Sequence, residues 1–363
     1  AELTRRTIAV EVARGATGVR YRPPPSPTGR LSVSRFARRL DRRWVRTSYS
    51  GLTAAAHDAG SASAADDVEI DDQAKIDEPP VTPDAAPTDD ALSVVLPLGD
   101  VPGGARIGTL VHDVLERTDF PAADLPGELA RACAETGARR MLEGHVDALV
   151  AGLALAIETP LGPRWDGWRL RDLARADRLD ELSFELPLAG GDHPHAALVT
   201  MDAIADVFAG LPADDPLAGY HDRLRDPLLA AGVRGFLTGS IDVVARVGDR
   251  HVVIDYKTNL LAPYGETPRA WNYRPAALTD AMQDAHYPLQ AALYSVALHR
   301  FLRWRLAGYD PARHLGGIAY LFLRGMTGAD VPLVDGQPCG VFAWHPPASF
   351  VTALSDVLDR GSP

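Results

Sequence analysis

Apolar and polar positions alternate with two different periods along this chain. A period of 3.6 residues predicts amphipathic helices, and a period of two predicts strands with one buried face. The helical period occurs over 108–120, and helices are also predicted over the Ala/Leu-rich stretch 125–157 and over 287–305 and 348–360. The strand alternation occurs over 182–190 and 235–257, and the apolar run 316–326 is also predicted as a strand. Helices followed by a central group of strands and further helices indicate a mixed α/β sheet with flanking helices.

The strand pattern over 235–257 predicts a hairpin. Its two-residue loop is Gly248-Asp249, and Gly at the first central position suits a type II′ turn. Counting outward from this loop places Asp242 directly opposite Asp255, so their side chains share one face. Lys257, two residues beyond Asp255, shares that face as well. The alternate positions are apolar and predict the buried face: Ile241, Val243, Val247, Val252 and Ile254.

This pair of carboxylates with a nearby ammonium points to metal-dependent chemistry. Two facing carboxylates repel each other when no cation lies between them. Hard divalent cations take such oxygen ligands, and a lysine beside them can position an activated water or neutralise charge that develops on a phosphate. Only two of the 37 basic residues are lysines, Lys75 and Lys257, so chance placement of Lys257 here is improbable. The alternative is a surface hairpin with an ordinary Asp–Lys pair.

An Asp on one strand, followed by Asp-Tyr-Lys on its hairpin partner, resembles the core of the PD-(D/E)XK nuclease superfamily. Ile241-Asp242 stands in place of the Pro-Asp of that core. The predicted helix that carries His112 resembles the helix that supplies an upstream histidine in the RecB-type branch. Gln290 and Tyr294 match the Gln-x-x-x-Tyr motif of the same branch. The resemblance covers about residues 30–360 and implies a restriction-endonuclease-like mixed sheet flanked by helices.

The resemblance implies a Mg²⁺-dependent deoxyribonuclease that hydrolyses phosphodiester bonds. The implied metal ligands are His112, Asp242, Asp255 and the main-chain carbonyl of Tyr256. The implied catalytic residues are Asp242, Asp255 and Lys257. The residues implied to contact DNA or to support the site are Gln290, Tyr294 and Glu185. Gln290 and Tyr294 are spaced i and i+4, so they lie on one face of their helix.

The RecB-type resemblance also implies partners. These are single- and double-stranded DNA, RecC-like and RecD-like subunits, and an ATP-driven helicase part of the same subunit, acting in double-strand-break repair by homologous recombination. The chain begins with Ala rather than Met, so we expect a fragment or a processed chain that lacks the helicase part. It contains no apolar run of membrane-spanning length and only two cysteines, Cys133 and Cys339. These features favour a bacterial cytoplasmic protein without membrane contact.

The net charge of −11 is unevenly distributed. Residues 1–50 carry 12 Arg and three acids, a net of +9, and residues 66–90 carry ten acids against one Lys, a net of −9. The basic arm is either a nucleic-acid contact or a solvated face. The acidic stretch belongs to a segment without aromatic residues, which cannot offset its ordering entropy. The predicted parts are a helicase-adjoining segment over 1–53, a flexible acidic linker over 54–92 and a nuclease domain over 93–363.

Two other functions fit parts of the same pattern. A catalytically inactive nuclease-fold scaffold or DNA-binding module would have a degenerate site, whereas all three residues of the core are present here. A Cas4-like nuclease would carry a cysteine-bound iron–sulfur cluster, and two cysteines cannot supply four ligands. The segment 269–274 interleaves basic and aromatic residues, which suits stacking contacts with a single strand or an ordinary surface loop equally. Its residues are Arg269, Trp271, Tyr273 and Arg274.

Overall fold

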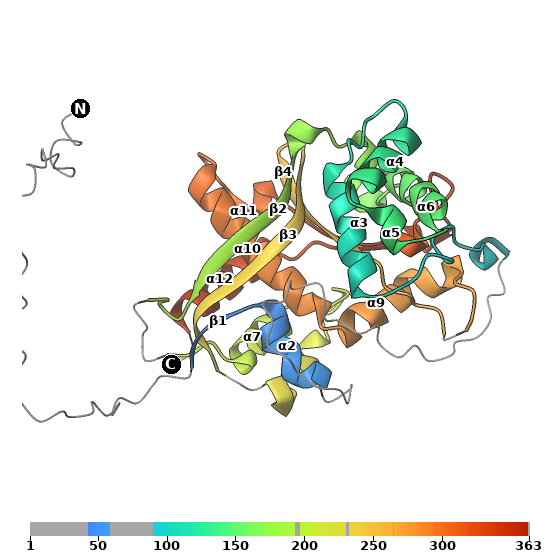
Figure 1. The fold of residues 1–363 in the computed structure, drawn as a ribbon. Helices are drawn as coiled ribbons and strands as arrows, with labels where there is room; N and C mark the ends of the chain where they lie inside the picture. Colours follow the sequence, from blue (N-terminus) through green and yellow to red (C-terminus); the bar gives the residue numbers. More distant parts are fainter. Residues whose placement is uncertain (1–42, 59–89, 193–196, 230–231, 264, 362–363) are drawn as a thin grey trace, which may run out of the picture. The chain divides into compact units, whose positions relative to one another are not determined.

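A six-stranded mixed sheet forms the centre of the protein (Figure 1). The computed structural model describes residues 43–58, 90–192, 197–229, 232–263 and 265–361. The strands of the sheet are β1 (Trp44–Thr47), β2 (Arg178–Leu188), β3 (Arg234–Val247), β4 (Arg250–Lys257), β5 (Leu315–Phe322) and β8 (Val341–Trp344). A separate two-stranded sheet consists of β6 (Leu333–Val334) and β7 (Gln337–Pro338). The expected mixed α/β architecture is therefore confirmed.

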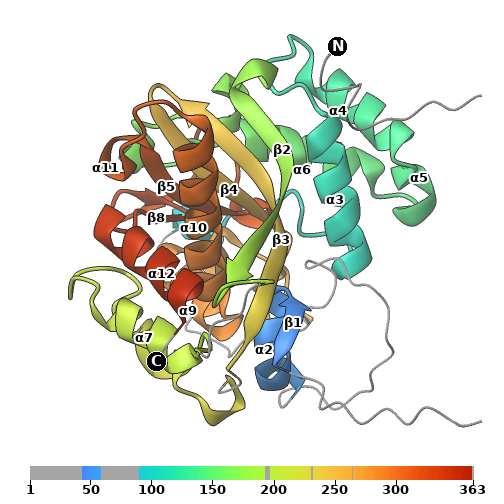
Figure 2. The ribbon, with the colours of Figure 1, turned by 90° about the vertical axis from the view of Figure 1, so that its left-hand side faces the viewer.

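Two groups of helices cover the two faces of the sheet (Figures 1 and 2). One group is α3 (Ala105–Arg117), α4 (Leu125–Glu135), α5 (Ala138–Met141) and α6 (Val146–Glu158). The other group contains α7 (Met201–Ala209), α8 (Tyr220–Leu224), α9 (Pro275–Asp284), α10 (Tyr287–Arg305) and α12 (Ala348–Arg360). The remaining helices are α2 (Tyr49–Asp58) and α11 (Pro311–His314). Each group packs its apolar side chains against its own face of the sheet, so the sheet separates two hydrophobic cores.

The β3–β4 hairpin has the register that its loop predicts. Val247 pairs with Arg250 across the loop, and Gly248 has a φ of 60°. The ladder continues to the pair Val243–Ile254, one step before the two aspartates. Burial differs from the expectation in one respect, because both faces of the hairpin are buried rather than one. The strand interiors carry apolar residues in both alternating sets, and both helix layers cover them.

Strand β3 is long, and two strands share one of its edges. β1 pairs with it in parallel along Arg234–Leu237, and β4 pairs with it in antiparallel from Val243 onward. β2 pairs with the opposite edge along most of the length of β3. The shared edge therefore has a gap between β1 and β4 over residues 238–242, and Asp242 lies at this gap.

The N-terminal elements belong to the same compact unit as the sheet. That unit spans Arg42–Pro363, so it begins ahead of the boundary predicted at 53/54. Of the two large aromatic residues in these elements, Tyr49 is buried and Trp44 is 38% exposed. Most of the basic arm, and residues 59–89 of the predicted linker, lie outside the described residues. The proposed division of the chain into functional parts remains a prediction.

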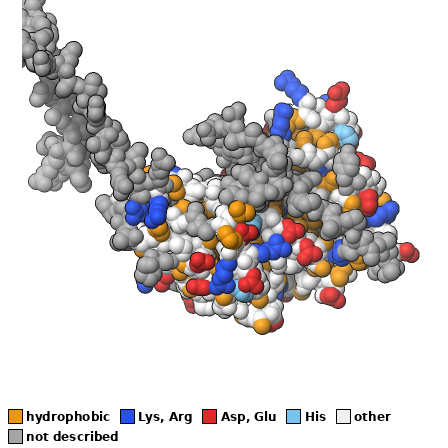
Figure 3. Space-filling view, turned by 90° about the horizontal axis from the view of Figure 1, so that it is seen from below, with side chains coloured by type: hydrophobic (Ala, Val, Ile, Leu, Met, Phe, Trp, Pro, Cys, Tyr) orange, Lys and Arg blue, Asp and Glu red, His pale blue; other side chains and the backbone are white. Residues whose placement is uncertain are grey.

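The predicted helices agree with the structure to different extents. α10 and α12 have the predicted bounds, whereas the predicted helical stretch 125–157 divides into α4, α5 and α6. In the described part of the chain, no single helix is long and apolar enough to cross a membrane, and only the bent pair Val146–Glu158 and Pro163–Asp172 passes by length and composition together. On the face seen in Figure 3, acidic and basic side chains of the described residues are intermixed.

Candidate active site

Asp242 lies where the β3–β4 ladder ends, and its side chain continues the hydrogen bonding. The backbone N–H of Tyr256 donates to Oδ2 of Asp242 at 2.7 Å. The carboxylate thus accepts the hydrogen bond that the main-chain carbonyl of Ile241 would accept if the β3–β4 ladder continued to Tyr256. Asp242 is only 2% exposed, and a bond from the backbone N–H fixes the orientation of its carboxylate.

His112 reaches the same point from helix α3. Its Nε2 lies 3.1 Å from the carbonyl oxygen of Tyr256, and its Nδ1 lies 3.4 Å from Oδ2 of Asp242. The structure therefore brings together three of the four predicted metal-binding groups. Burial disfavours the imidazolium, but the Asp242 carboxylate outweighs burial and raises the pKa of His112. Burial likewise opposes the charged form of Asp242, and the neighbouring His112 and Lys257 outweigh it and lower the pKa of Asp242.

Asp255 and Lys257 lie at the end of β4 and form a buried ion pair. Nζ of Lys257 is 2.7 Å from Oδ2 of Asp255, and the two residues are 8% and 1% exposed. Oδ1 of Asp255 is buried and has no hydrogen-bond partner among the described residues. Burial raises the pKa of Asp255 to about 6; Lys257 opposes this rise, and the adjacent Asp242 adds to it. A buried carboxylate oxygen in this state is costly unless a cation satisfies it.

Glu181 of β2 is a site residue that the sequence did not reveal. The pairs Asp180–Val243 and Leu182–Ile241 flank it, so it lies across from Asp242. Its carboxylate and ligand atoms of His112 and Asp242 all lie within 4.8 Å of one another. Ser240 Oγ donates to its Oε2 at 2.9 Å, and Glu181 has an unusual φ of 48°.

The environment of the Glu181 carboxylate changes its acidity. The residue as a whole is exposed, but its carboxylate is turned toward buried Asp242. Partial desolvation and the charge of Asp242 raise the pKa of Glu181 to about 7. A positive φ is strained for a residue with a Cβ and is found most often at functional sites. Glu181 is therefore a candidate metal ligand.

Glu185 is not brought into this cluster. It pairs with Thr238 in the sheet, and its Oε2 forms an ion pair with Arg46 at 2.9 Å. Both side chains are largely exposed. Four residues along a strand span about 13 Å, so Glu185 lies well away from the position of Glu181. Of these two acids, the structure places only Glu181 beside His112 and Asp242.

Gln290 and Tyr294 of α10 point inward and support Lys257. Oε1 of Gln290 accepts a hydrogen bond from Nζ of Lys257 at 3.4 Å and one from the Tyr320 hydroxyl at 2.9 Å. Its amide Nε2 donates to the Tyr294 hydroxyl at 3.1 Å. Gln290 and Tyr294 are 1% and 2% exposed. This burial favours a role in supporting the site over direct contact with a DNA strand.

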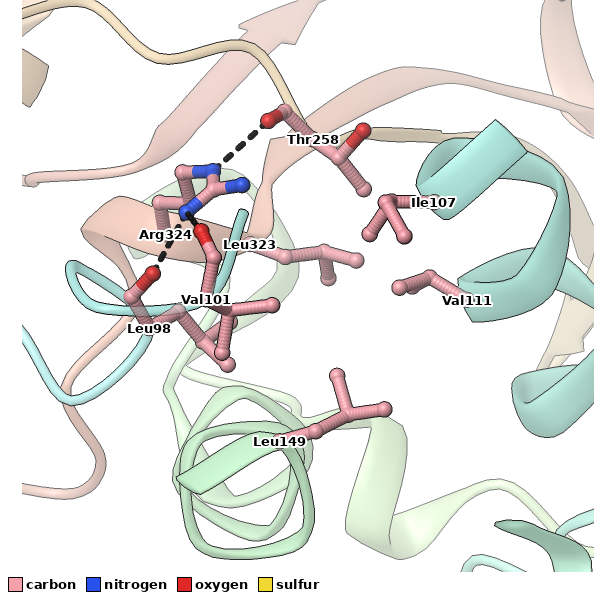
Figure 4. Close-up of a pocket in the computed structure, with 8 residues that line it drawn as sticks. All are labelled: Leu98, Val101, Ile107, Val111, Leu149, Thr258, Leu323 and Arg324. Carbon is pink, nitrogen blue, oxygen red and sulfur yellow. Dashed lines mark hydrogen bonds between the residues drawn. The ribbon is translucent and has the colours of Figure 1, made fainter. Parts of the chain in front are cut away.

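Arg324, which follows β5, connects the segment before α3 to the end of β4 (Figure 4). Its buried guanidinium donates to the carbonyl oxygens of Val101 at 2.7 Å and Pro102 at 2.8 Å, in the segment that leads into α3. It also donates to the carbonyl of Leu98, and at 2.8 Å to that of Thr258, which directly follows Lys257. These bonds hold the start of the helix that carries His112 against the end of β4.

In the segment 269–274, Tyr273 fits neither of the two expected alternatives, stacking with a single strand or an exposed surface loop. Tyr273 is fully buried, and its hydroxyl donates to the carbonyl of Asn259 at 2.9 Å. The stacking prediction is therefore wrong for Tyr273. The guanidinium of Arg274 lies 4.0 Å from the centre of the Trp271 ring, so these two side chains stack on each other.

The sequence profile described as the PD-(D/E)XK nuclease superfamily matches residues 96–341. The chain belongs to this superfamily. Among curated proteins it is similar to the RecBCD enzyme subunit RecB of Mycolicibacterium smegmatis, with 45% identity over 94% of this chain and 31% of that protein. The RecB subunit of Mycobacterium tuberculosis is 45% identical over 93% of this chain and 30% of that protein. That of Escherichia coli is 30% identical over 91% of this chain and 24% of that protein.

These matches place the chain among PD-(D/E)XK nuclease homologues of RecB. They extend beyond the hairpin, because they cover more than nine tenths of the chain. The chain spans less than a third of the length of each of these relatives.

Proposed function

We propose that this chain is the nuclease module of a RecB-type subunit and that it hydrolyses DNA phosphodiester bonds with Mg²⁺. The meeting of His112 of α3 with Asp242 of β3, beside the ion pair of Asp255 and Lys257 at the end of β4, carries this proposal. The family membership supports it, because the core carboxylates and the lysine of a PD-(D/E)XK nuclease are all present. A degenerate site, which the inactive-scaffold alternative requires, is not what the described residues form.

The residues present fit a divalent cation. Oδ1 of buried Asp255 has no hydrogen-bond partner among the described residues, and carboxylate and carbonyl oxygens are the ligands that Mg²⁺ prefers. The groups that would hold the ion are His112, Glu181, Asp242, Asp255 and the carbonyl of Tyr256. A bound ion supplies polarisation of the scissile phosphate and a lower pKa for its water.

The residues of this chain would then divide the remaining work. Asp242 is held by the N–H of Tyr256, so its carboxylate is oriented before any ion binds. Asp255 holds the ammonium of Lys257 at 2.7 Å, next to the ligand set. From there Lys257 would position the attacking water or stabilise the charge that develops on the phosphate.

The wider context of the module is also proposed. The relatives are named as RecB subunits of the RecBCD enzyme. We infer RecC-like and RecD-like partner subunits, a helicase part in the same subunit, and single- and double-stranded DNA as substrates in double-strand-break repair. A bacterial cytoplasmic location follows from the same inference.

A Mg²⁺ titration of DNA degradation tests the proposed function. The wild-type chain and the variants Asp255→Ala and Lys257→Ala are compared on single- and double-stranded DNA. We expect each variant to lose about 10³-fold in rate, the upper range for removing one electrostatic group from an active site. Asp249→Ala is the matched control, because Asp249 lies in the loop of the same hairpin and pairs with Arg313 at the exposed surface. Undiminished cleavage by either site variant would overturn the proposal.

A further inference from the structure

Two tyrosine rings lie beside the ammonium of Lys257. Nζ lies 4.2 Å from the ring centre of Tyr287 and 5.2 Å from that of Tyr320. The two rings stack on each other with centres 5.7 Å apart and planes inclined by 24°. Both distances are within the range of cation–π attraction. Asp255 and Gln290 also contact the ammonium, so four side chains lie around one charge, and Lys257 stays 8% exposed.

The rings themselves are fixed by hydrogen bonds. The Tyr320 hydroxyl donates to Oε1 of Gln290 at 2.9 Å and lies 3.4 Å from the carbonyl oxygen of Tyr287. The Tyr287 hydroxyl donates to Oδ1 of Asn259 at 3.4 Å. Tyr287 and Tyr320 are 2% and 0% exposed. Their rotamers are therefore set by the core and do not depend on DNA.

We propose that Tyr287 and Tyr320 form an aromatic box that positions the side chain of Lys257 and accepts an ammonium but not a guanidinium. A lysine side chain has four rotatable bonds. If its conformation is already restricted before the substrate binds, no conformational entropy is lost during the reaction. Arg carries a larger, planar group, and the ammonium already contacts both rings, Asp255 and Gln290, with only 8% of the residue exposed. The inference rests on the proposed function, since it assigns positioning residues to the proposed catalytic lysine.

The box adds residues beyond the Gln-x-x-x-Tyr motif. Gln290 contacts Lys257 directly, and Tyr294 is linked to it through Gln290. Tyr287 precedes the motif by three residues on α10, and Tyr320 comes from β5, the strand next to β4. Residues from two separate elements therefore restrain one lysine.

Lysine NMR tests the box without any reliance on activity. Because Lys75 and Lys257 are the only lysines in the chain, selective ¹³C labelling of lysine gives only two ε-methylene signals, and Lys257→Met assigns them. We expect ring currents to shift the Lys257 signal upfield in the wild type. The shift should persist in Tyr287→Phe, which keeps the ring, and should largely disappear in Tyr287→Leu. A Lys257 signal at the position of an unrestrained lysine in the wild type would overturn the box.

Kinetics then test whether the box matters for cleavage. For Tyr287→Leu we expect kcat to fall at least about tenfold, since small displacements of a reacting group cost up to about 10²-fold. KM for DNA and Mn²⁺ affinity by calorimetry should stay within about twofold, and Tyr287→Phe should restore kcat. Tyr309→Leu is the control, because Tyr309 contacts His299 and His314 instead. Equal losses in the Phe and Leu variants, or a parallel loss of Mn²⁺ affinity, would overturn the positioning role.

The two tests separate this inference from the proposed function. A wild-type chain that cleaves no DNA with Mg²⁺ contradicts the proposed function, while the NMR shift still decides whether the box exists. A chain that cleaves DNA but shows no upfield lysine signal contradicts the box alone.

Discussion

The groups on the two sides of the Asp255 carboxylate differ in their exposure to solvent. On one side lies the acidic ligand set, with His112, buried Asp242 and the exposed residue Glu181. On the other side lies Lys257, which is 8% exposed and enclosed by aromatic rings and Gln290. The first side is rich in negative charge next to solvent, and the second holds one positive charge in a filled space.

This difference matches what each side would have to do. An ion enters and leaves, and its ligands therefore need a route to water and tolerate movement. A lysine that acts on a single water or phosphate oxygen has to stay at one position. Removing a group from the enclosed side should therefore affect rate, and removing one from the open side should affect ion binding.

Among the substitutions that test this comparison, Lys257→Arg should give the largest effect. The substitution keeps the charge but places a larger, planar group against the rings of Tyr287 and Tyr320. We expect a loss in kcat of about 10²-fold or more, comparable to removal of an active-site donor, with DNA binding unchanged. Steady-state cleavage kinetics and a DNA-binding isotherm measure the two quantities. Full activity in this variant would show that the enclosed side does not distinguish an ammonium from a guanidinium.

Glu181→Gln should weaken ion binding on the open side. We expect Mn²⁺ affinity measured by calorimetry to fall about 10–100-fold, in the range found for groups that tune metal sites. Glu185→Gln is the matched control on the same strand, because it removes only an exposed ion pair with Arg46 that contributes about 0–1 kcal/mol. An equal loss of affinity in both variants would contradict the assignment of Glu181.

The Mn²⁺ affinity of the site should depend on pH between 6 and 8, and the change over one pH unit should be smaller than the loss in Glu181→Gln. The pKa of Glu181 is raised to about 7 and that of Asp255 to about 6, so protons compete with the ion below these values. Raising the pH removes the protons, and affinity should therefore increase, by at most about tenfold per pH unit for each proton released. Calorimetry at pH 6, 7 and 8 measures it, and Glu181→Gln should flatten the upper part of the curve. Constant affinity over this range would argue against both carboxylates as ligands.

The hairpin core of the site was predictable because local rules determine it. A two-residue loop with Gly at its first position fixes the pairing of the next residues, and the observed pair Val247–Arg250 follows from that count. Continuing the same count places Asp242 opposite Asp255, with Lys257 two residues beyond. The predicted bounds of α10, 287–305, also agree with the structure, although its buried residues run without a break from Tyr287 to His299 and so follow no helical period.

Glu181 could not be found in the same way. It meets Asp242 through the pairing of β2 with β3, which joins strands that are far apart in the sequence and has no local signature. Glu181 and Glu185 are four residues apart, so a period of two places both on the same face and does not distinguish them. A positive φ at Glu181 is likewise set by tertiary contacts. Tyr273 illustrates the converse, because basic neighbours suggested an exposed loop whereas its ring is buried in the core.

The position of β1 and α2 has a consequence for how the chain can be divided. These elements precede residues 59–89, yet β1 pairs with Arg234–Leu237 of β3, and the buried Tyr49 hydroxyl donates to the carbonyl of Ala285. A protease site placed within 59–89 and then cut should therefore yield a split protein, with two fragments joined by strand pairing and core packing. We expect the fragments to co-elute in size-exclusion chromatography and to retain Mg²⁺-dependent cleavage. Separation of the fragments without denaturant would contradict this. The acidic stretch would then be a dispensable covalent connection within one folding unit, and the shortest active nuclease would begin before it.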